Sequence, residues 1–261
     1  MKKPTFLDFD RPLITDMIIE EKPADIENHL CAGEQEGADA FGIEIEWLRR
    51  EYRTEEVFRN MFQYLSGKPL YVTNYRNGFN EGMSEEARMD ELKLALKCGA
   101  TLVDLTGDTF APTKYELTRD PAAVDRQRKL IDEFHALGGE VLMSTHVLEY
   151  RSPEEVLDIA LEQQKRGVDI AKIVTFSGNE EEMYANMDTV RLLKRELKIP
   201  FLFLSGGPYC RMHRVLGPYY GVCMWLCVDA YTEHSSRTQP LLRSLVQIVR
   251  NVDLSPLVTG K

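Results

Sequence analysis

Short apolar runs alternate with longer amphipathic stretches along the chain. The runs are rich in β-branched and aromatic residues, as buried strands are, whereas the stretches between them repeat apolar positions every three to four residues, as helices do. The predicted strands are LITDMII at 13–19, AFGIEIEWL at 40–48, PLYVTNYR at 69–76, TLVDLTG at 101–107, EVLMSTHV at 140–147, DIAKIVTF at 169–176, PFLFLSGG at 200–207 and GVCMWLCV at 221–228. A helical stretch follows each strand, so the sequence predicts eight βα units.

Eight βα units are compatible with either an open sheet or a closed barrel. An open nucleotide-binding sheet would have a glycine-rich turn after its first strand, and the link here is EEKPAD. We therefore predict an α/β protein with a single (β/α)8 TIM barrel, whose typical length of about 250 residues is close to that of the chain. No linker divides the sequence, so one domain is expected over 1–261, with 1–12 as an N-terminal extension and 253–261 as a C-terminal tail.

Composition excludes several classes of function. The chain carries 42 acidic against 32 basic residues, a formal charge of -10, so no positive field would attract nucleic acid. Its five cysteines include no CxxC pair, and no carboxylate and histidine cluster has ligand spacing, so neither a metal nor another cofactor is expected. No signal or membrane segment is visible, which favours the cytoplasm.

The two strongest candidates for chemistry are a lysine and a histidine on neighbouring strands. Lys172 interrupts the apolar run IAKIVTF, where burial disfavours its charged form and leaves an amine that can attack a ketone. His146 ends the preceding strand, so it is expected to lie beside the lysine at the carboxyl-end mouth of the barrel. The pair predicts a nucleophile with a neighbouring general acid and base.

Charged residues at other strand ends are candidate binding groups. Glu44 and Glu46 have the same parity on the second strand, so both are expected to face one side. Arg76 ends the third strand, and Glu81 follows it in the loop RNGFNEG. An ion-pair layer that fills the barrel is the alternative role for these charges.

The turn after the seventh strand predicts an anion site. It reads SGGPYCRMHR, in which glycine backbone precedes a short helix that carries Arg211 and Arg214. Such a turn commonly binds a carboxylate or a phosphate. A solvated basic helix start is the alternative interpretation.

These residues together resemble the type I 3-dehydroquinate dehydratase family over nearly the whole chain. The motifs are STH at 144–146, AKI at 171–173, SGG through Arg214 at 205–214, and the segment from Ser235 to Gln239 before the last helix. The resemblance implies that Lys172 forms an imine with the substrate ketone and that His146 acts as general base and acid. Arg214 would hold the substrate carboxylate, and Ser235 and Gln239 would belong to a lid loop over the mouth. The groups around the substrate hydroxyls would include Glu44 or Glu46, Arg76 and Glu81.

The sequence departs from the family's pattern at substrate contacts. Family members usually carry Glu-x-Arg on the second strand, where this chain has EIEWL at 44–48. The usual Asp-x-Glu of the fourth strand is DLT at 104–106, and the position after the histidine is Val147 rather than an acid or amide. The Schiff-base residues match better than their surroundings, so both dehydroquinate and a related cyclic β-hydroxyketone acid are candidate substrates.

The resemblance implies a lyase of the shikimate pathway, in aromatic amino acid biosynthesis, that acts on a small carboxylate without a cofactor. Two alternatives stay open. One is a class I aldolase-like enzyme that uses the same lysine on another keto acid, and the other is a non-catalytic barrel that binds a small anion. Barrels often dimerise through their outer helices, so a homodimer is the oligomer to consider.

Overall fold

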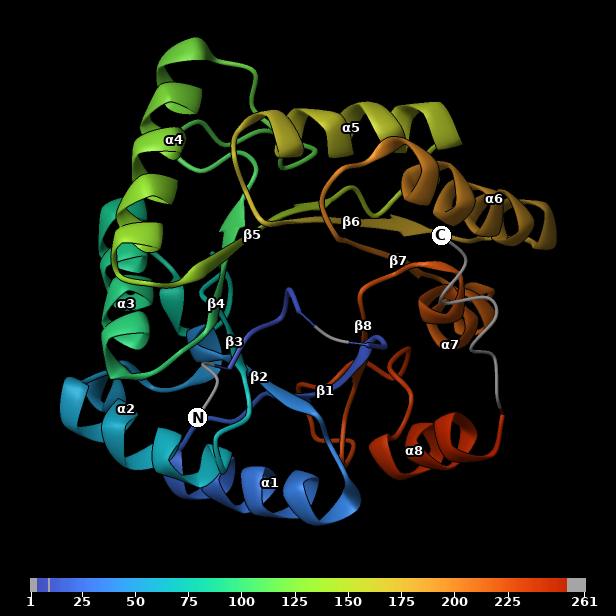
Figure 1. The fold of residues 1–261 in the computed structure, drawn as a ribbon. Helices are drawn as coiled ribbons and strands as arrows, with labels where there is room; N and C mark the ends of the chain where they lie inside the picture. Colours follow the sequence, from blue (N-terminus) through green and yellow to red (C-terminus); the bar gives the residue numbers. More distant parts are fainter. Residues whose placement is uncertain (1–3, 9, 253–261) are drawn as a thin grey trace.

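A computed structural model describes residues 4–8 and 10–252, which form a ring of parallel strands inside a ring of helices (Figure 1). The strands are β1 (Leu13–Ile18), β2 (Ala40–Glu44), β3 (Leu70–Thr73), β4 (Leu102–Thr106), β5 (Glu140–His146), β6 (Ile170–Phe176), β7 (Phe201–Gly206) and β8 (Met224–Cys227). The α-helices are α1 (Pro23–Glu36), α2 (Glu55–Phe62), α3 (Glu85–Cys98), α4 (Pro121–Ala136), α5 (Pro153–Lys165), α6 (Glu180–Glu196), α7 (Cys210–Tyr220) and α8 (Leu242–Asn251). This alternation confirms the predicted (β/α)8 TIM barrel.

The strands are joined in the order β7-β6-β5-β4-β3-β2-β1-β8. The two end strands, β7 and β8, meet through the backbone bond from Cys223 N to Phe201 O, 2.9 Å long, at their amino ends. The barrel is therefore nearly closed, with a seam between β7 and β8. The loops that follow these two strands lie at the carboxyl side of the seam.

Strand register places the predicted site residues on the inner face of the barrel. Lys172 on β6 pairs with Ser144 on β5 and with Leu202 on β7, and His146 pairs with Val174. Register partners in a parallel sheet point to the same face, and residues two apart on a strand do so as well. Lys172 and His146 thus face the same side, with His146 nearer to the carboxyl end.

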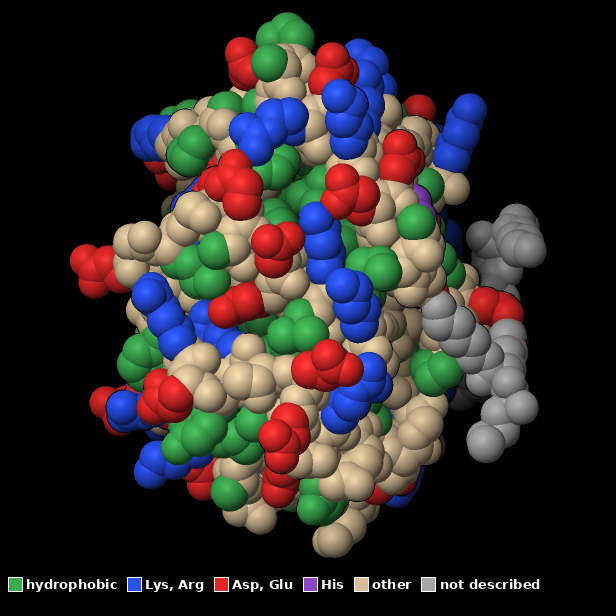
Figure 2. All heavy atoms as spheres, turned by 90° about the vertical axis from the view of Figure 1, so that its left-hand side faces the viewer, with side chains coloured by type: hydrophobic (Ala, Val, Ile, Leu, Met, Phe, Trp, Pro, Cys, Tyr) green, Lys and Arg blue, Asp and Glu red, His purple; other side chains and the backbone are tan. Residues whose placement is uncertain are grey.

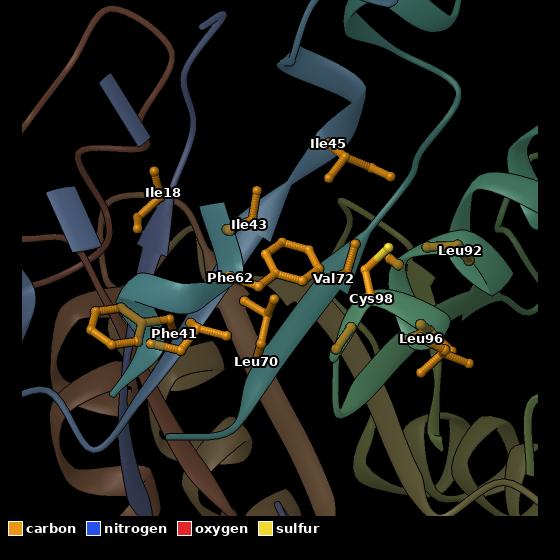
Figure 3. Packing of buried hydrophobic residues seen from close by; sticks show 14 of the residues in the cluster. Ile18, Phe41, Ile43, Ile45, Phe62, Leu70, Val72, Leu92, Leu96 and Cys98 are labelled. Atoms are coloured by element: carbon orange, nitrogen blue, oxygen red, sulfur yellow. The ribbon is translucent and has the colours of Figure 1, made fainter. Parts of the chain in front are cut away.

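Residues on the outer face of the strands form the core between the barrel and its helices. In Figure 3, Phe41, Ile43, Leu70 and Val72 of β2 and β3 lie close to side chains of α2 and α3, including Phe62. Their alternation with inward-facing polar residues is what the sequence pattern of these two strands predicts. The helices therefore cover the barrel with apolar contacts, and the inward-facing polar side chains lie toward the carboxyl end of its interior.

The N-terminal segment closes the amino end of the barrel. Phe6 is fully buried in the same cluster as Met17, Leu102 and Leu142. Its backbone N–H donates to Glu140 Oε2 at the start of β5, over 2.9 Å, and the Thr5 hydroxyl donates to the same carboxylate. The opposite, carboxyl end is thus the accessible mouth. Residues 253–261, predicted as a tail, lie outside the described residues.

The face over α3 and α4 carries charges of both signs (Figure 2). Many of them form ion pairs between neighbouring helices, as Arg126 does with Glu86 at 2.7 Å and Lys93 with Glu133 at 2.6 Å. Among the described residues, no helix is long and apolar enough to cross a membrane.

Candidate functional site

Lys172 lies inside the barrel mouth and has polar partners on β3, on the loop that follows β3, and on β4. Its side chain is 6% exposed. The ammonium Nζ donates to the hydroxyls of Tyr71 and Tyr75, at 3.0 and 2.5 Å, and to Asp104 Oδ2 at 3.1 Å. From the sequence, an amine isolated among apolar groups was expected. The structure instead gives this amine a carboxylate counter-charge and two phenols, because β3 and β4 turn these side chains inward.

Asp104 on β4 is the hub of this network. Its Oδ1 accepts a 2.5 Å hydrogen bond from the Ser144 hydroxyl, and its Oδ2 accepts from the hydroxyls of both tyrosines as well as from the lysine. Burial by itself would raise the pKa of Asp104, yet the Lys172 ammonium and these hydroxyl donors outweigh it, and the pKa lies below its ordinary value. Asp104 is therefore held as a carboxylate.

The two tyrosines are neutral hydrogen-bond donors. Burial, together with the nearby Asp104 charge, raises the pKa of both Tyr71 and Tyr75 well above the ordinary value of 10. Their hydroxyls can consequently donate to Asp104 while they accept from Lys172. A sequence signal existed, because Tyr71 follows the same inward parity as the polar residues of β3.

His146 is oriented by Glu116, which was not among the site residues predicted from the sequence. Its Nδ1 lies 2.7 Å from Glu116 Oε2, and its backbone N–H donates to the same oxygen at 3.1 Å. The imidazole also meets the Tyr75 ring edge-on, with 5.2 Å between ring centroids. With Nδ1–H donating to Glu116, the tautomer leaves Nε2 as the nitrogen that can accept a proton.

Glu116 reaches the histidine from the loop between β4 and α4. Its backbone has a left-handed φ of 49°, which is uncommon for a residue with a side chain. A Cβ at Gly107 would lie 2.7 Å from the Glu116 carbonyl oxygen, so this approach requires glycine there. Burial would raise the pKa of Glu116, but its hydrogen bonds to His146 dominate, and the pKa is lowered. Such an irregular loop carries no periodic signal that could reveal the contact.

The two glutamates of the second βα unit lie in different elements. β2 ends at Glu44, and Glu46 lies in a 3₁₀ turn, Ile45–Trp47, so the predicted strand over 40–48 is too long and the parity argument does not apply. Glu46 is nevertheless fully buried and accepts hydrogen bonds from the Thr73 hydroxyl at 2.9 and 3.1 Å. The chain turns here because β2 reaches the mouth, where the sheet ends.

Both glutamates have raised pKa values. Desolvation raises the pKa of Glu44 to about 7, against the opposing field of Lys172 and with a further contribution from Asp104. Desolvation, with the neighbouring Glu44 charge, raises the pKa of Glu46 to about 8. Near neutral pH Glu46 thus carries a proton that it can donate as a hydrogen bond, whereas Glu44 can either donate or accept a proton.

Arg76 and Glu81 have partners away from Lys172. Arg76 donates from Nη1 to Asp108 Oδ1 at 2.8 Å and from Nε to Glu85 Oε1 at 2.7 Å. Glu81 is exposed, and its carbonyl oxygen accepts from Arg50 at 2.8 Å. The substrate-binding role of both residues stays a prediction, and in this conformation Arg76 is already neutralised by acids.

The predicted anion turn and lid loop lie beside a cavity of about 240 Å³. Arg214 on α7 lines it and donates from Nε to the Ser205 carbonyl oxygen at 2.8 Å. Gln239 also lines it and is 8% exposed, whereas the Ser235 hydroxyl bonds to the backbone of Thr232 and so shapes the loop. In the described part of the chain no group of three histidine, cysteine or acidic residues could hold a metal ion.

A family model and a curated relative indicate the same family. The Type I 3-dehydroquinase family model matches residues 17–256. A 3-dehydroquinate dehydratase of Alkaliphilus oremlandii (strain OhILAs) is 29% identical over 99 residues, a match that takes in 37% of this chain and only 39% of that relative.

Solved structures of similar proteins share the fold. A 3-dehydroquinate dehydratase from Geobacillus kaustophilus HTA426 superposes with a TM-score of 0.76 at 15% identity, covering 93% of this chain and 92% of its own. A type I enzyme from Clostridium difficile, solved with covalently modified comenic acid, gives 0.76 at 16% identity and covers 96% and 94%. At these sequence identities the solved structures show only that the barrel fold is shared. The family model matches most of the sequence and therefore shows the family as well. The chain belongs to the type I 3-dehydroquinase family.

Proposed function

We propose that this protein is a Schiff-base lyase that removes water from 3-dehydroquinate or a related cyclic β-hydroxyketone acid. The observation that carries the proposal is the buried Lys172 amine, hydrogen-bonded to Asp104 and two tyrosines, with His146 contacting one of those tyrosines. Family membership supports the same reaction class. In the cell the reaction would belong to the shikimate pathway, in the cytoplasm.

The first step joins the lysine to the substrate ketone. The ammonium of Lys172 must lose a proton before it attacks, and the nearby Glu44 carboxylate, with a pKa of about 7, is suited to accept one. The neutral amine adds to the carbonyl carbon, the carbinolamine loses water, and an iminium forms. Tyr75, 2.5 Å from Nζ, is placed to pass a proton to the departing oxygen.

The second step is the elimination itself. The iminium acidifies the α-carbon, and His146 removes its proton through Nε2 to give an enamine. The enamine then expels the β-hydroxyl, which takes the proton back from the imidazolium and leaves as water. Hydrolysis of the conjugated iminium releases the enone product and restores the Lys172 amine.

Glu116 would stabilise the imidazolium formed during this cycle. Its carboxylate, 2.7 Å from Nδ1, holds the ring in the tautomer that the proton transfer needs. Family members usually carry an acid or amide directly after the histidine, where this chain has the buried Val147. Glu116 thus supplies a polar partner from another loop.

Substrate binding would use groups from two sides of the mouth. Glu46, protonated near neutral pH, can donate a hydrogen bond to a substrate hydroxyl without repelling an anion, and Glu44 can do the same once it has accepted the proton of Lys172. Arg214 would hold the substrate carboxylate, with Gln239 and the loop shaped by Ser235 covering it. With acids on the hydroxyl side and Arg214 on the carboxylate side, substrate binding would not depend on the arginine that family members usually carry on the second strand.

Turnover of dehydroquinate tests the proposal. The product is a conjugated enone, so its ultraviolet absorbance follows the reaction. We expect turnover by the wild type and a loss of at least about 10⁴-fold in Lys172→Ala, the scale seen when a covalent nucleophile is removed. Lys97→Ala, which removes an exposed lysine of α3, is the control and should match the wild type. Equal activity in Lys172→Ala would refute the mechanism.

A further inference from the structure

The loop that carries Glu116 contains two strained backbone positions. We call residues 107–118, between β4 and α4, the Glu116 loop. Phe110 and Glu116 both have a left-handed φ, of 74° and 49°, although neither is glycine. Such positions cost energy, persist only where the surrounding structure holds them, and gather at functional sites. The contacts that hold this loop therefore decide how Glu116 reaches His146.

The two ends of the Glu116 loop are held by one buried arginine. Arg166 directly follows the last residue of α5, and its side chain is fully buried. Its Nη1 donates to the carbonyl oxygen of Gly107 at 2.7 Å, and its Nη2 donates to the carbonyl oxygen of Thr118. The backbone N–H of Thr118 also donates to the Gly107 oxygen, at 3.1 Å. Arg166 thus fastens the first and last residues of the loop at the point where they meet.

Every donor of the Arg166 guanidinium is used. Besides the two carbonyl contacts, Nη1 donates to Gln127 Oε1 at 2.7 Å, and Nε and Nη2 donate to Glu162 Oε1 at 3.3 and 3.2 Å. A guanidinium has five N–H groups in a fixed plane, so these bonds match its full capacity. Gln127 on α4 in turn donates to the carbonyl oxygens of Gly107 and Thr109, at 3.2 and 2.8 Å. A lysine ammonium, with three donors at one point, could not reproduce this arrangement.

A second side chain from the last turn of α5 supports the loop next to Glu116 itself. Gln163 is fully buried, and its Nε2 donates to the Thr145 hydroxyl and to the backbone oxygen of Lys172, both at 3.0 Å. The Thr145 hydroxyl donates to the Glu116 carbonyl oxygen at 3.2 Å. Gln163 and Arg166 are three residues apart, so they share one side of the helix end. This side of α5 therefore connects the strand of the reacting lysine with the loop that orients the histidine.

We propose that Arg166 is a positioning residue, which holds the Glu116 loop in the conformation that brings the Glu116 carboxylate to His146 Nδ1. A role in stability alone explains a buried guanidinium poorly, because apolar side chains of similar volume often stabilise a protein as well or better. A planar group with five directed donors instead fixes one conformation of an irregular loop. The effect on turnover rests on the proposed function, whereas the effect on the imidazole does not.

The position of the proton on the His146 ring tests this role without any substrate. Nitrogen NMR of isotope-labelled histidine distinguishes a neutral ring protonated on Nδ1 from one protonated on Nε2. We expect the Nδ1 tautomer in the wild type, where it donates to Glu116, and a mixture of tautomers in Arg166→Lys and in Gln127→Met. Arg191→Lys, on α6 and 74% exposed, is the control and should give the wild-type spectrum. An unchanged Nδ1 tautomer in both loop variants overturns the proposal, even if those variants are less stable.

Kinetics with dehydroquinate test the same role in catalysis. Arg166→Lys should lower kcat about tenfold, because a small displacement of Glu116 weakens its contact with His146, and should leave KM within about twofold. In the Glu116→Gln background the same change should cost less than about twofold, since residues that act through one contact are not additive. A full tenfold loss in that background, or an unchanged kcat in Arg166→Lys, would make Arg166 a structural residue. If the wild type does not turn over dehydroquinate, the proposed function fails, and the NMR result still decides whether Arg166 positions His146.

Discussion

Two regions of the barrel mouth handle charge in opposite ways. Around Lys172, the polar groups have partners within the protein: the buried ammonium faces the buried Asp104, and the partly exposed Glu116 faces His146. Around the cavity beside the start of α7, the guanidinium groups of Arg211, Arg214 and Arg237 have no acid among the described lining residues. A network whose hydrogen bonds are all made within the protein holds reacting groups in fixed positions. Donors that have no acceptor in the protein are available to bind a ligand. Under the proposed function, the chemistry belongs to the first region and the recognition of the substrate carboxylate to the second.

The largest expected effect within the matched region is at His146. His146→Ala should slow turnover by about 10²–10⁴-fold, the usual contribution of a positioned acid and base. Lys172 keeps all its hydrogen-bond partners in this variant, so borohydride should still trap an imine. Unchanged turnover would assign the proton transfer to another group.

Glu116→Gln tests whether the histidine depends on its matched carboxylate. The substitution keeps the shape but removes the charge that stabilises the imidazolium, and we expect a loss in kcat of about 10²-fold, less than the ~10⁴-fold seen when the carboxylate of a catalytic triad is replaced. Glu116→Asp should recover part of the loss, and the pH profile of kcat should shift. The exposed Glu149 is the matched control: Glu149→Gln should retain wild-type kcat. A variant that loses only stability would make Glu116 a structural residue.

Glu46→Gln tests the buried acids through stability. The folded pKa of about 8 lies above the ordinary 4.5, so the stabilisation from this proton is complete at low pH and disappears as pH rises through 8. Glutamine cannot ionise, so the variant does not lose this stabilisation. The free energy of unfolding of Glu46→Gln minus that of the wild type should therefore be on the order of 3 kcal/mol higher at pH 9 than at pH 5. Urea unfolding at the two pH values measures this, with the exposed Glu51→Gln as control. Equal differences at both pH values would mean that Glu46 is charged when folded.

The smallest expected effect is on recognition. Arg214→Lys keeps the charge but loses the planar fork, so the KM for dehydroquinate should rise about tenfold, the loss of one charge-assisted hydrogen bond, while imine trapping persists at high substrate. Arg211→Lys should change KM less. If Arg211→Lys alone impairs binding, the carboxylate role belongs to Arg211 and the comparison with the family's arginine is misaligned.

The sequence was sufficient to predict the fold. It was also sufficient to single out Lys172 and His146 as candidates for chemistry. Alternating apolar runs and amphipathic stretches define βα units, and eight of them can close into a barrel. Lys172 stands out because an amine in an apolar strand is costly without a partner. His146 stands out because it ends the adjacent strand.

The partners of these residues required three-dimensional information. Asp104 and Tyr71 reach Lys172 across the barrel interior, and that distance depends on how the strands close. Glu116 reaches His146 from an irregular loop with a left-handed residue. The ion pairs of Arg76 with Asp108 and Glu85 also have no signal in the sequence, because they depend on how the loops after β3 and β4 fold.

Imine trapping at Lys172 tests the central claim most directly. The wild-type protein is incubated with dehydroquinate, reduced with borohydride, digested and analysed by mass spectrometry. We expect a stable adduct on the peptide that contains Lys172. The adduct should be absent from Lys172→Ala while that variant keeps its fold. No adduct, or an adduct on another lysine, would contradict the claim that this buried amine is the reacting group.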